Sequence, residues 1–101
     1  MAKITEKDLE RYLVRQCKKH GVLCYKFSSP ARRGVPDRVL IHNGTVLFLE
    51  LKAPGKKPTQ LQRHHLNLID DEDVPAVWTD CKEGVDQALQ IVGIKGLTPA
   101  S

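Results

Sequence analysis

The sequence has little of several features that mark particular classes of protein. Its 101 residues include one tryptophan, two tyrosines and two phenylalanines, too few for the stacking of exposed bases to be its main mode of recognition. No apolar stretch is as long as the about 18 residues that a membrane-spanning helix needs. The segment MAKITEKDLE lacks the apolar core of a signal peptide. We therefore expect a soluble, cytoplasmic protein without a membrane partner.

Cysteines are also few, and their number and spacing exclude two common uses. Cys17, Cys24 and Cys81 are odd in number and form no C-x-x-C pair, so neither a disulfide framework nor a zinc site is expected. The four histidines show no metal-ligand spacing either. Buried, reduced thiols are the expectation for the three cysteines.

The charges that are present favour an anionic partner. Lys and Arg number 16 against 12 Asp and Glu, which gives a formal net charge of +4, and nucleic acid is the obvious candidate. A chain of 101 residues has room for one modest core. We predict a single domain over residues 1–93 and a flexible tail over 94–101.

Local patterns predict the element order α-β-β-β-α-β-α. A capping Thr5 followed by acids begins the first helix, and the box T-x-x-Q from Thr59 to Gln62 begins the second. The predicted elements are a helix over 5–19, a strand over 23–28, a hairpin over 34–52, a helix over 59–70, a strand over 75–80 and a helix over 82–92. This order is typical of an α/β domain whose mixed β-sheet is flanked by helices.

The hairpin GVPDRVLIHNGTVLFLELK carries charged residues within apolar strands. Asn43-Gly44 is the strongest short signal for a two-residue turn with positive φ at both positions. Counting outward from this turn pairs Asp37 with Glu50, and like charges directly opposed destabilise a sheet. Lys52 projects from the same face as Glu50, because side chains alternate along a strand. The three charged side chains should therefore converge.

A divalent cation would explain this convergence. Such an ion is bound by one or two carboxylates and several waters, which would relieve the repulsion between the acids. The alternative is an ion-pair patch on an exposed face of the sheet. Apolar residues on both faces count against it, because a strand that is apolar on both faces is covered on both. They are Val39, Ile41, Val46 and Phe48 on the acidic face, and Leu40, Leu47, Leu49 and Leu51 on the other.

The spacing P-D, twelve residues, E-L-K resembles that of the PD-(D/E)xK nuclease superfamily, and RGVPDRVL with FLELKAPGKKPTQLQ is similar to its VRR-NUC branch. The resemblance runs from Glu10 to about Trp78, roughly two thirds of the chain. It implies a restriction-endonuclease-like core and a DNA-cleaving enzyme that uses Mg²⁺ or Mn²⁺. The branch includes small stand-alone proteins of viruses and bacteria, so a virus-encoded member would act in the host cytoplasm.

The resemblance also implies roles for individual residues. Asp37 and Glu50 would bind the metal, with the main-chain carbonyl of Leu51 as a further ligand. Lys52 would position or polarise the attacking water. Gln62 occupies the position of the family's helix glutamine near the site; its capping role explains it equally well, and both roles can hold together.

A further acid is implied on the first helix. E-R-Y-L-V, with a glycine eleven residues after its glutamate, is similar to the first helix of archaeal Holliday junction resolvases and selects Glu10 as a catalytic residue. Glu10 also shares a helix face with Leu13 and Cys17, which turns it inward, whereas Glu6 lies in the first turn, where it meets the helix dipole. A solvated rim position is the alternative for Glu10, and Glu6 is then the next candidate.

Five basic residues near the predicted site are suited to sequence-independent phosphate contacts. They are Arg32 and Arg33 before the hairpin, Lys56 and Lys57 after it, and Lys26 on the preceding strand. Ordinary solvation of loop side chains is the alternative for each of them.

The resulting hypothesis is a metal-dependent, structure-specific DNA endonuclease that cuts branched DNA. Four-way junctions are the favoured substrate, and a homodimer is the acting form. Two other hypotheses remain, a non-catalytic nucleic-acid-binding module on the same fold and a structural or protein-binding domain with an ion-pair patch. The joint presence of Asp37, Glu50 and Lys52 argues against the non-catalytic module.

Overall fold

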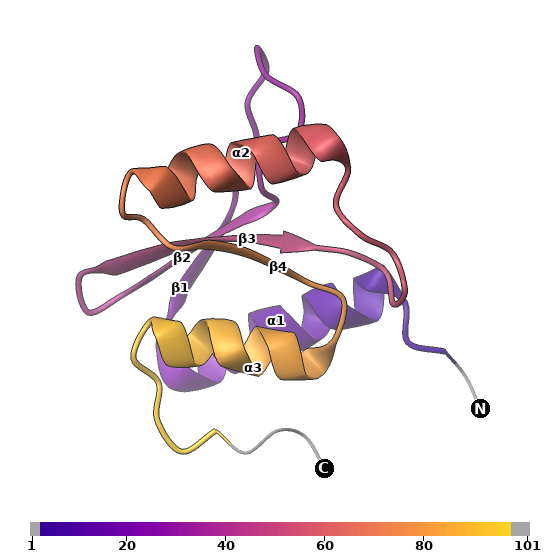
Figure 1. Cartoon of the computed structure of the whole chain (residues 1–101). Helices are drawn as coiled ribbons and strands as arrows, with labels where there is room; N and C mark the ends of the chain where they lie inside the picture. Colours follow the sequence, from indigo (N-terminus) through magenta and orange to yellow (C-terminus); the bar gives the residue numbers. More distant parts are fainter. Residues whose placement is uncertain (1–2, 98–101) are drawn as a thin grey trace.

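The computed structural model describes residues 3–97 and contains the predicted elements in the predicted order (Figure 1). They are α1 (Glu6–His20), β1 (Leu23–Lys26), β2 (Arg38–His42), β3 (Thr45–Leu51), α2 (Gln60–Asp71), β4 (Ala76–Thr79) and α3 (Lys82–Ile91). Capping boxes begin two helices as predicted, because Thr5 accepts the N–H of Asp8 and Thr59 accepts the N–H of Gln62. The predicted α/β fold class is confirmed.

The four strands form one sheet in the order β1-β2-β3-β4, antiparallel except for the parallel pair β3 and β4. The turn between β2 and β3 has φ of 50° at Asn43 and 81° at Gly44, the positive values that an Asn-Gly turn requires. The register is the predicted one and extends to Arg38. Asp37 and Glu50 are the next residues outward, so the turn chemistry brings the two acids to the same end of the sheet.

Helices cover the two faces of the sheet unequally. α1 and α3 pack on one face and form the core with the leucines of the hairpin, whereas α2 packs on the other face beside β4 (Figure 1). The core includes Leu9, Leu13, Leu40, Leu47, Leu49, Leu51, Val85 and Leu89. On the α2 side, Leu23 and Tyr25 of β1 are 51% and 54% exposed. The expectation that both faces are covered therefore holds for one face and only in part for the other.

The chain continues to contribute to the core after α3, where the sequence predicts a flexible tail over 94–101. Ile94 is 9% exposed and belongs to the core, and Leu97 packs against it, while residues 98–101 lie outside the described part of the chain. The prediction is wrong for Ile94, because its side chain is buried by tertiary packing that the local pattern does not reveal.

Two expectations from composition can be compared with the structure. Cys17 is buried as expected, whereas Cys24 and Cys81 are half-buried, and all three are free thiols. Within residues 3–97, no helix combines the length and the apolar character needed to cross a membrane.

Candidate active site

Two acids meet at the end of the sheet where β3 leads into α2. Glu50 is the last residue but one of β3 and is 3% exposed, while Asp37, directly before β2, is exposed. The Oδ2 atom of Asp37 accepts the main-chain N–H of Leu51 at 3.1 Å. This hydrogen bond fixes Asp37 to the strand that carries Glu50 and keeps the two acids adjacent.

Glu50 is a buried acid with an unsatisfied oxygen. Its Oε1 atom is buried and has no hydrogen-bond partner among the described residues, which is unfavourable for a polar atom. Burial, and after it the nearby charge of Asp37, raise the pKa of Glu50 to about 8, and Lys52 partly opposes this rise. Without a cation, Glu50 therefore holds a proton at neutral pH.

The raised pKa predicts how stability without a metal depends on pH. Folded protein keeps the Glu50 proton up to about pH 8, whereas the unfolded chain releases it near the ordinary value of 4.5, so stability falls as pH rises between these values and then levels off. Melting temperatures in a chelator should therefore decrease between about pH 6 and about pH 8. The variant Glu50→Gln should lack the part of this decrease that titration of Glu50 causes. An equal decrease of the melting temperature in wild type and variant would contradict the raised pKa of Glu50.

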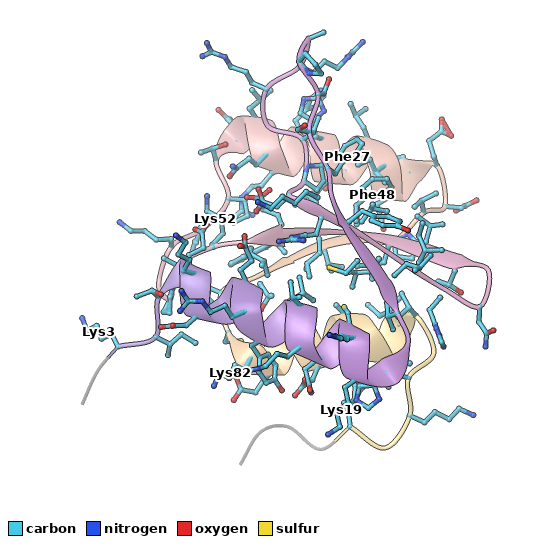
Figure 2. The ribbon with its side chains drawn as sticks, turned by 180° about the vertical axis from the view of Figure 1, so that it is seen from behind. Lys3, Lys19, Phe27, Phe48, Lys52 and Lys82 are labelled. Atoms are coloured by element: carbon cyan, nitrogen blue, oxygen red, sulfur yellow. The ribbon has the colours of Figure 1, made fainter. Side chains whose placement is uncertain are left out.

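Lys52 is held by the helix that follows it. Its Nζ donates to Gln62 Oε1 at 3.2 Å, and the same oxygen accepts the N–H of Thr59 at 2.8 Å, which completes the capping box of α2. The capping role of Gln62 is therefore confirmed, and the same oxygen atom contacts the ammonium group of Lys52. Lys52 is half-buried at the end of the sheet that carries the acids (Figure 2).

The structure does not bring Glu10 to the two acids. Its Oε2 lies 3.6 Å from the guanidinium of Arg38, whose side chain projects from the sheet face opposite to Glu50. Glu6, one turn earlier on α1, is instead among the charges that raise the pKa of Glu50. Among the described residues, neither glutamate joins Asp37 and Glu50 in a group of three acids that could hold a metal, and Glu6 is the one whose charge acts on Glu50.

Arg38 is a residue of this region that the sequence patterns did not single out. It is 7% exposed, and its Nη1 donates to Cys24 Sγ at 3.9 Å in addition to the ion pair with Glu10. The available signal was an arginine two residues before the buried Leu40 on the core face of β2, since a buried cation requires a partner.

The five basic residues predicted to contact nucleic acid are all exposed, but they occupy different places. Arg32 and Arg33 lie in the loop between β1 and β2, which extends beyond α2 at the top of Figure 1. Lys56 and Lys57 lie in the loop between β3 and α2. Lys26 projects from the sheet face opposite to the acids, so its side chain is directed away from the candidate site.

The residues present suit a divalent cation with few protein ligands. Among residues 3–97, no group of three or more His, Cys, Asp and Glu side chains is placed to hold a metal, so the site offers the two carboxylates of Asp37 and Glu50. Mg²⁺ bound by one or two carboxylates keeps several waters. The partnerless Oε1 of Glu50 is a buried oxygen that a cation would satisfy. The donor set therefore fits a hard divalent ion.

The arrangement defines a class of protein. One acid precedes a strand, a second acid lies in the next strand, and a lysine follows the second acid by two residues. These groups lie at one end of a mixed sheet with helices on both faces. This is the nuclease fold of the PD-(D/E)xK class.

Comparisons with known proteins agree with this class. No family model matches the chain. The chain is 51% identical over 71 residues to "Putative nuclease p44" of Acyrthosiphon pisum secondary endosymbiont phage 1, a match that covers 68% of this chain and 76% of the phage protein. A solved structure described as a VRR_NUC domain matches with a TM-score of 0.76 and 21% identity, over 86% of this chain and 97% of that one. The chain therefore belongs to the VRR-NUC family.

Proposed function

We propose that the protein is a divalent-metal-dependent DNA endonuclease that hydrolyses phosphodiester bonds in branched DNA. The observation that carries the proposal is the buried, partnerless carboxylate oxygen of Glu50, adjacent to Asp37 and close to Lys52. A surface ion-pair patch would be solvated and would leave no buried oxygen in need of a cation. Membership of the VRR-NUC family supports the same activity.

In the proposed mechanism, Asp37 and Glu50 would hold Mg²⁺ or Mn²⁺, and the main-chain carbonyl of Leu51 would be a further ligand. When bound, the ion supplies Lewis-acid stabilisation of the phosphate and lowers the pKa of a bound water. Lys52 stabilises the negative charge that develops on the phosphate, and Gln62 orients its ammonium group. As a metal ligand, Glu50 would be deprotonated, because a coordinating carboxylate is deprotonated.

The two glutamates of α1 receive different roles in this proposal. Glu10 is a positioning residue, because it neutralises Arg38, the residue directly after Asp37. Glu6 acts on Glu50 through its charge, so it is the next candidate for the catalytic role that the sequence resemblance implies for Glu10.

Exposed basic residues of two loops are proposed to contact the DNA backbone. They are Arg32, Arg33, Lys56 and Lys57, and Lys26 of β1 is a further candidate on the opposite face of the sheet. Phosphate contacts carry no sequence information and make affinity fall steeply with salt concentration. Recognition would then depend on the shape of the DNA, and a four-way junction is the proposed favoured substrate.

An exposed apolar surface supports a homodimer as the acting form. Leu23, Tyr25 and Phe27 are 51%, 54% and 36% exposed, and Phe27 packs edge-on against Phe48 with 5.2 Å between the ring centroids (Figure 2). Contiguous exposed apolar residues mark interaction surfaces. A two-fold dimer would present two sites to the two strands of a symmetric junction.

A cleavage assay on DNA of several shapes tests the proposed function. Linear duplex, flap, gapped duplex and four-way junction are each incubated with Mg²⁺, Mn²⁺ or chelator. We expect metal-dependent cleavage, fastest and with paired incisions on the four-way junction, by a protein that light scattering shows to be a dimer. Binding without cleavage in either metal would favour the non-catalytic module, and absence of both would favour a structural domain.

A further inference from the structure

A hollow between α1 and α3, outside the candidate active site, collects basic side chains. It has a volume of about 360 Å³ and is lined by Lys3, Ile4, Asp8, Arg11, Arg15 and Lys82. Four of these six residues are basic and one is acidic. A hollow lined by charges of one sign focuses the electrostatic potential and attracts ligands of the opposite charge.

The single acid of the hollow does not neutralise it. One carboxylate oxygen of Asp8 accepts the N–H of the helix-capping residue at 2.9 Å, and the other lies 3.6 Å from Arg11. Within residues 3–97, no carboxylate forms an ion pair with Lys3, Arg15 or Lys82. Three cations of the hollow are therefore available to an anionic ligand.

One of these cations is held in place by packing between the two helices. Lys82 Nζ lies 5.2 Å from the centre of the Tyr12 ring, a favourable cation–π arrangement. The hydroxyl of Tyr12 donates in turn to the buried Asp86 of α3 at 2.8 Å. These contacts connect α1 to α3, so the two walls of the hollow keep a fixed separation.

A second hollow adjoins the first at the loop that follows Lys52. It has a volume of about 260 Å³ and is lined by Pro54, Ile4 and Lys82, together with the acids Asp80 and Glu83. A hydrogen bond of 2.9 Å from the N–H of Gly55 to Asp80 fixes this loop against the turn that precedes α3. Figure 2 shows Lys3 near the N-terminal end of α1, with Lys52 above that helix and Lys82 below it, whereas Lys19 lies at the other end of α1.

We propose that the α1–α3 hollow binds backbone phosphates of the DNA substrate, in a segment beyond the phosphodiester that is cut. The inference rests on the proposed function and adds a second contact surface to it. The four basic residues that line the hollow suit neighbouring phosphates of one chain better than a single anion. Arg15 can donate two parallel hydrogen bonds to one phosphate, and Lys3 and Lys82 act as point charges beside it.

The test compares two double variants that lose the same charge from exposed positions. Lys3→Gln/Arg15→Gln changes the hollow, and Lys18→Gln/Lys19→Gln changes the C-terminal end of α1. Affinity for a labelled four-way junction is measured by fluorescence anisotropy at several salt concentrations, in a chelator to prevent cleavage. The hollow variant should bind about tenfold more weakly, and the slope of log affinity against log salt should become shallower by about 1 to 2, since each lost phosphate contact contributes about 0.9.

The control variant should retain an affinity and a slope close to those of wild type. A hollow variant that matches the control, while wild type binds and cuts DNA, would overturn this inference and leave the proposed function intact. A wild type that neither binds nor cuts DNA would overturn both. Melting curves of the two double variants check that they fold. The single variant Arg15→Glu is a second test of the hollow, and it should also bind the four-way junction more weakly than wild type.

Discussion

Lys52→Ala is expected to lower the rate of cleavage by about 10²- to 10³-fold, the usual effect of removing one group that stabilises charge in a transition state. Metal and DNA binding should change little, because the ammonium group acts on charge that develops during the reaction. The cap of α2 should persist, since Gln62 Oε1 still accepts the N–H of Thr59. Single-turnover cleavage, DNA affinity and the Mn²⁺-dependent melting temperature measure these effects separately.

Lys19→Ala is the matched control for Lys52→Ala. It also removes one lysine, but from an exposed position at the far end of α1 (Figure 2). The control should cleave at the wild-type rate. A wild-type rate in Lys52→Ala as well would exclude the assigned role of Lys52.

Asp37→Asn is expected to abolish both cleavage and the rise in melting temperature that Mn²⁺ produces in wild type. The rise reflects an ion that binds the folded site and finds no such site in the unfolded chain. In a chelator at about pH 8, where Glu50 titrates, the variant should melt slightly higher than wild type, because a charge that opposes ionisation of Glu50 is gone. The gain should be small, since Asp37 is exposed and water screens its charge.

Melting curves of wild type and Asp37→Asn, each in chelator and in Mn²⁺, measure both effects. Asparagine keeps an oxygen that can accept the N–H of Leu51, so the local fold should survive. Asp71→Asn, at an exposed position at the end of α2, is the control. Absence of a metal effect in wild type, together with a lower melting temperature of Asp37→Asn in chelator, would mean that the acids form an ordinary surface patch.

The hairpin and the adjacency of the two acids could be predicted because local chemistry determines them. Asn43-Gly44 allows one turn geometry, and the turn determines the register of β2 and β3. The acids follow by counting along the strands. The capping boxes at Thr5 and Thr59 also depend only on residues that are close in the sequence. They predicted the first residues of α1 and α2 to within one residue.

The surroundings of the acids could not be predicted in the same way, because they depend on how distant elements pack. The sequence patterns suggested that both acids are covered, but α2 packs beside β4, so Glu50 is buried and Asp37 is exposed. The choice between Glu6 and Glu10 depends on how α1 is rotated and placed over the sheet. Both glutamates are compatible with the helical pattern, and the pairing of Glu10 with Arg38 is a contact between elements far apart in the chain.

The oxygen of Gln62 that accepts hydrogen bonds from both Lys52 and Thr59 has a consequence for motion. The first turn of a helix is among the parts of a fold that are least protected from amide hydrogen exchange, because it unfolds locally on short timescales. Each opening of the first turn of α2 would withdraw the acceptor that orients Lys52. The fraction of molecules with a correctly oriented lysine should therefore follow the fraction in which this turn is closed, so that a local helix–coil equilibrium sets an upper limit on the population ready to react.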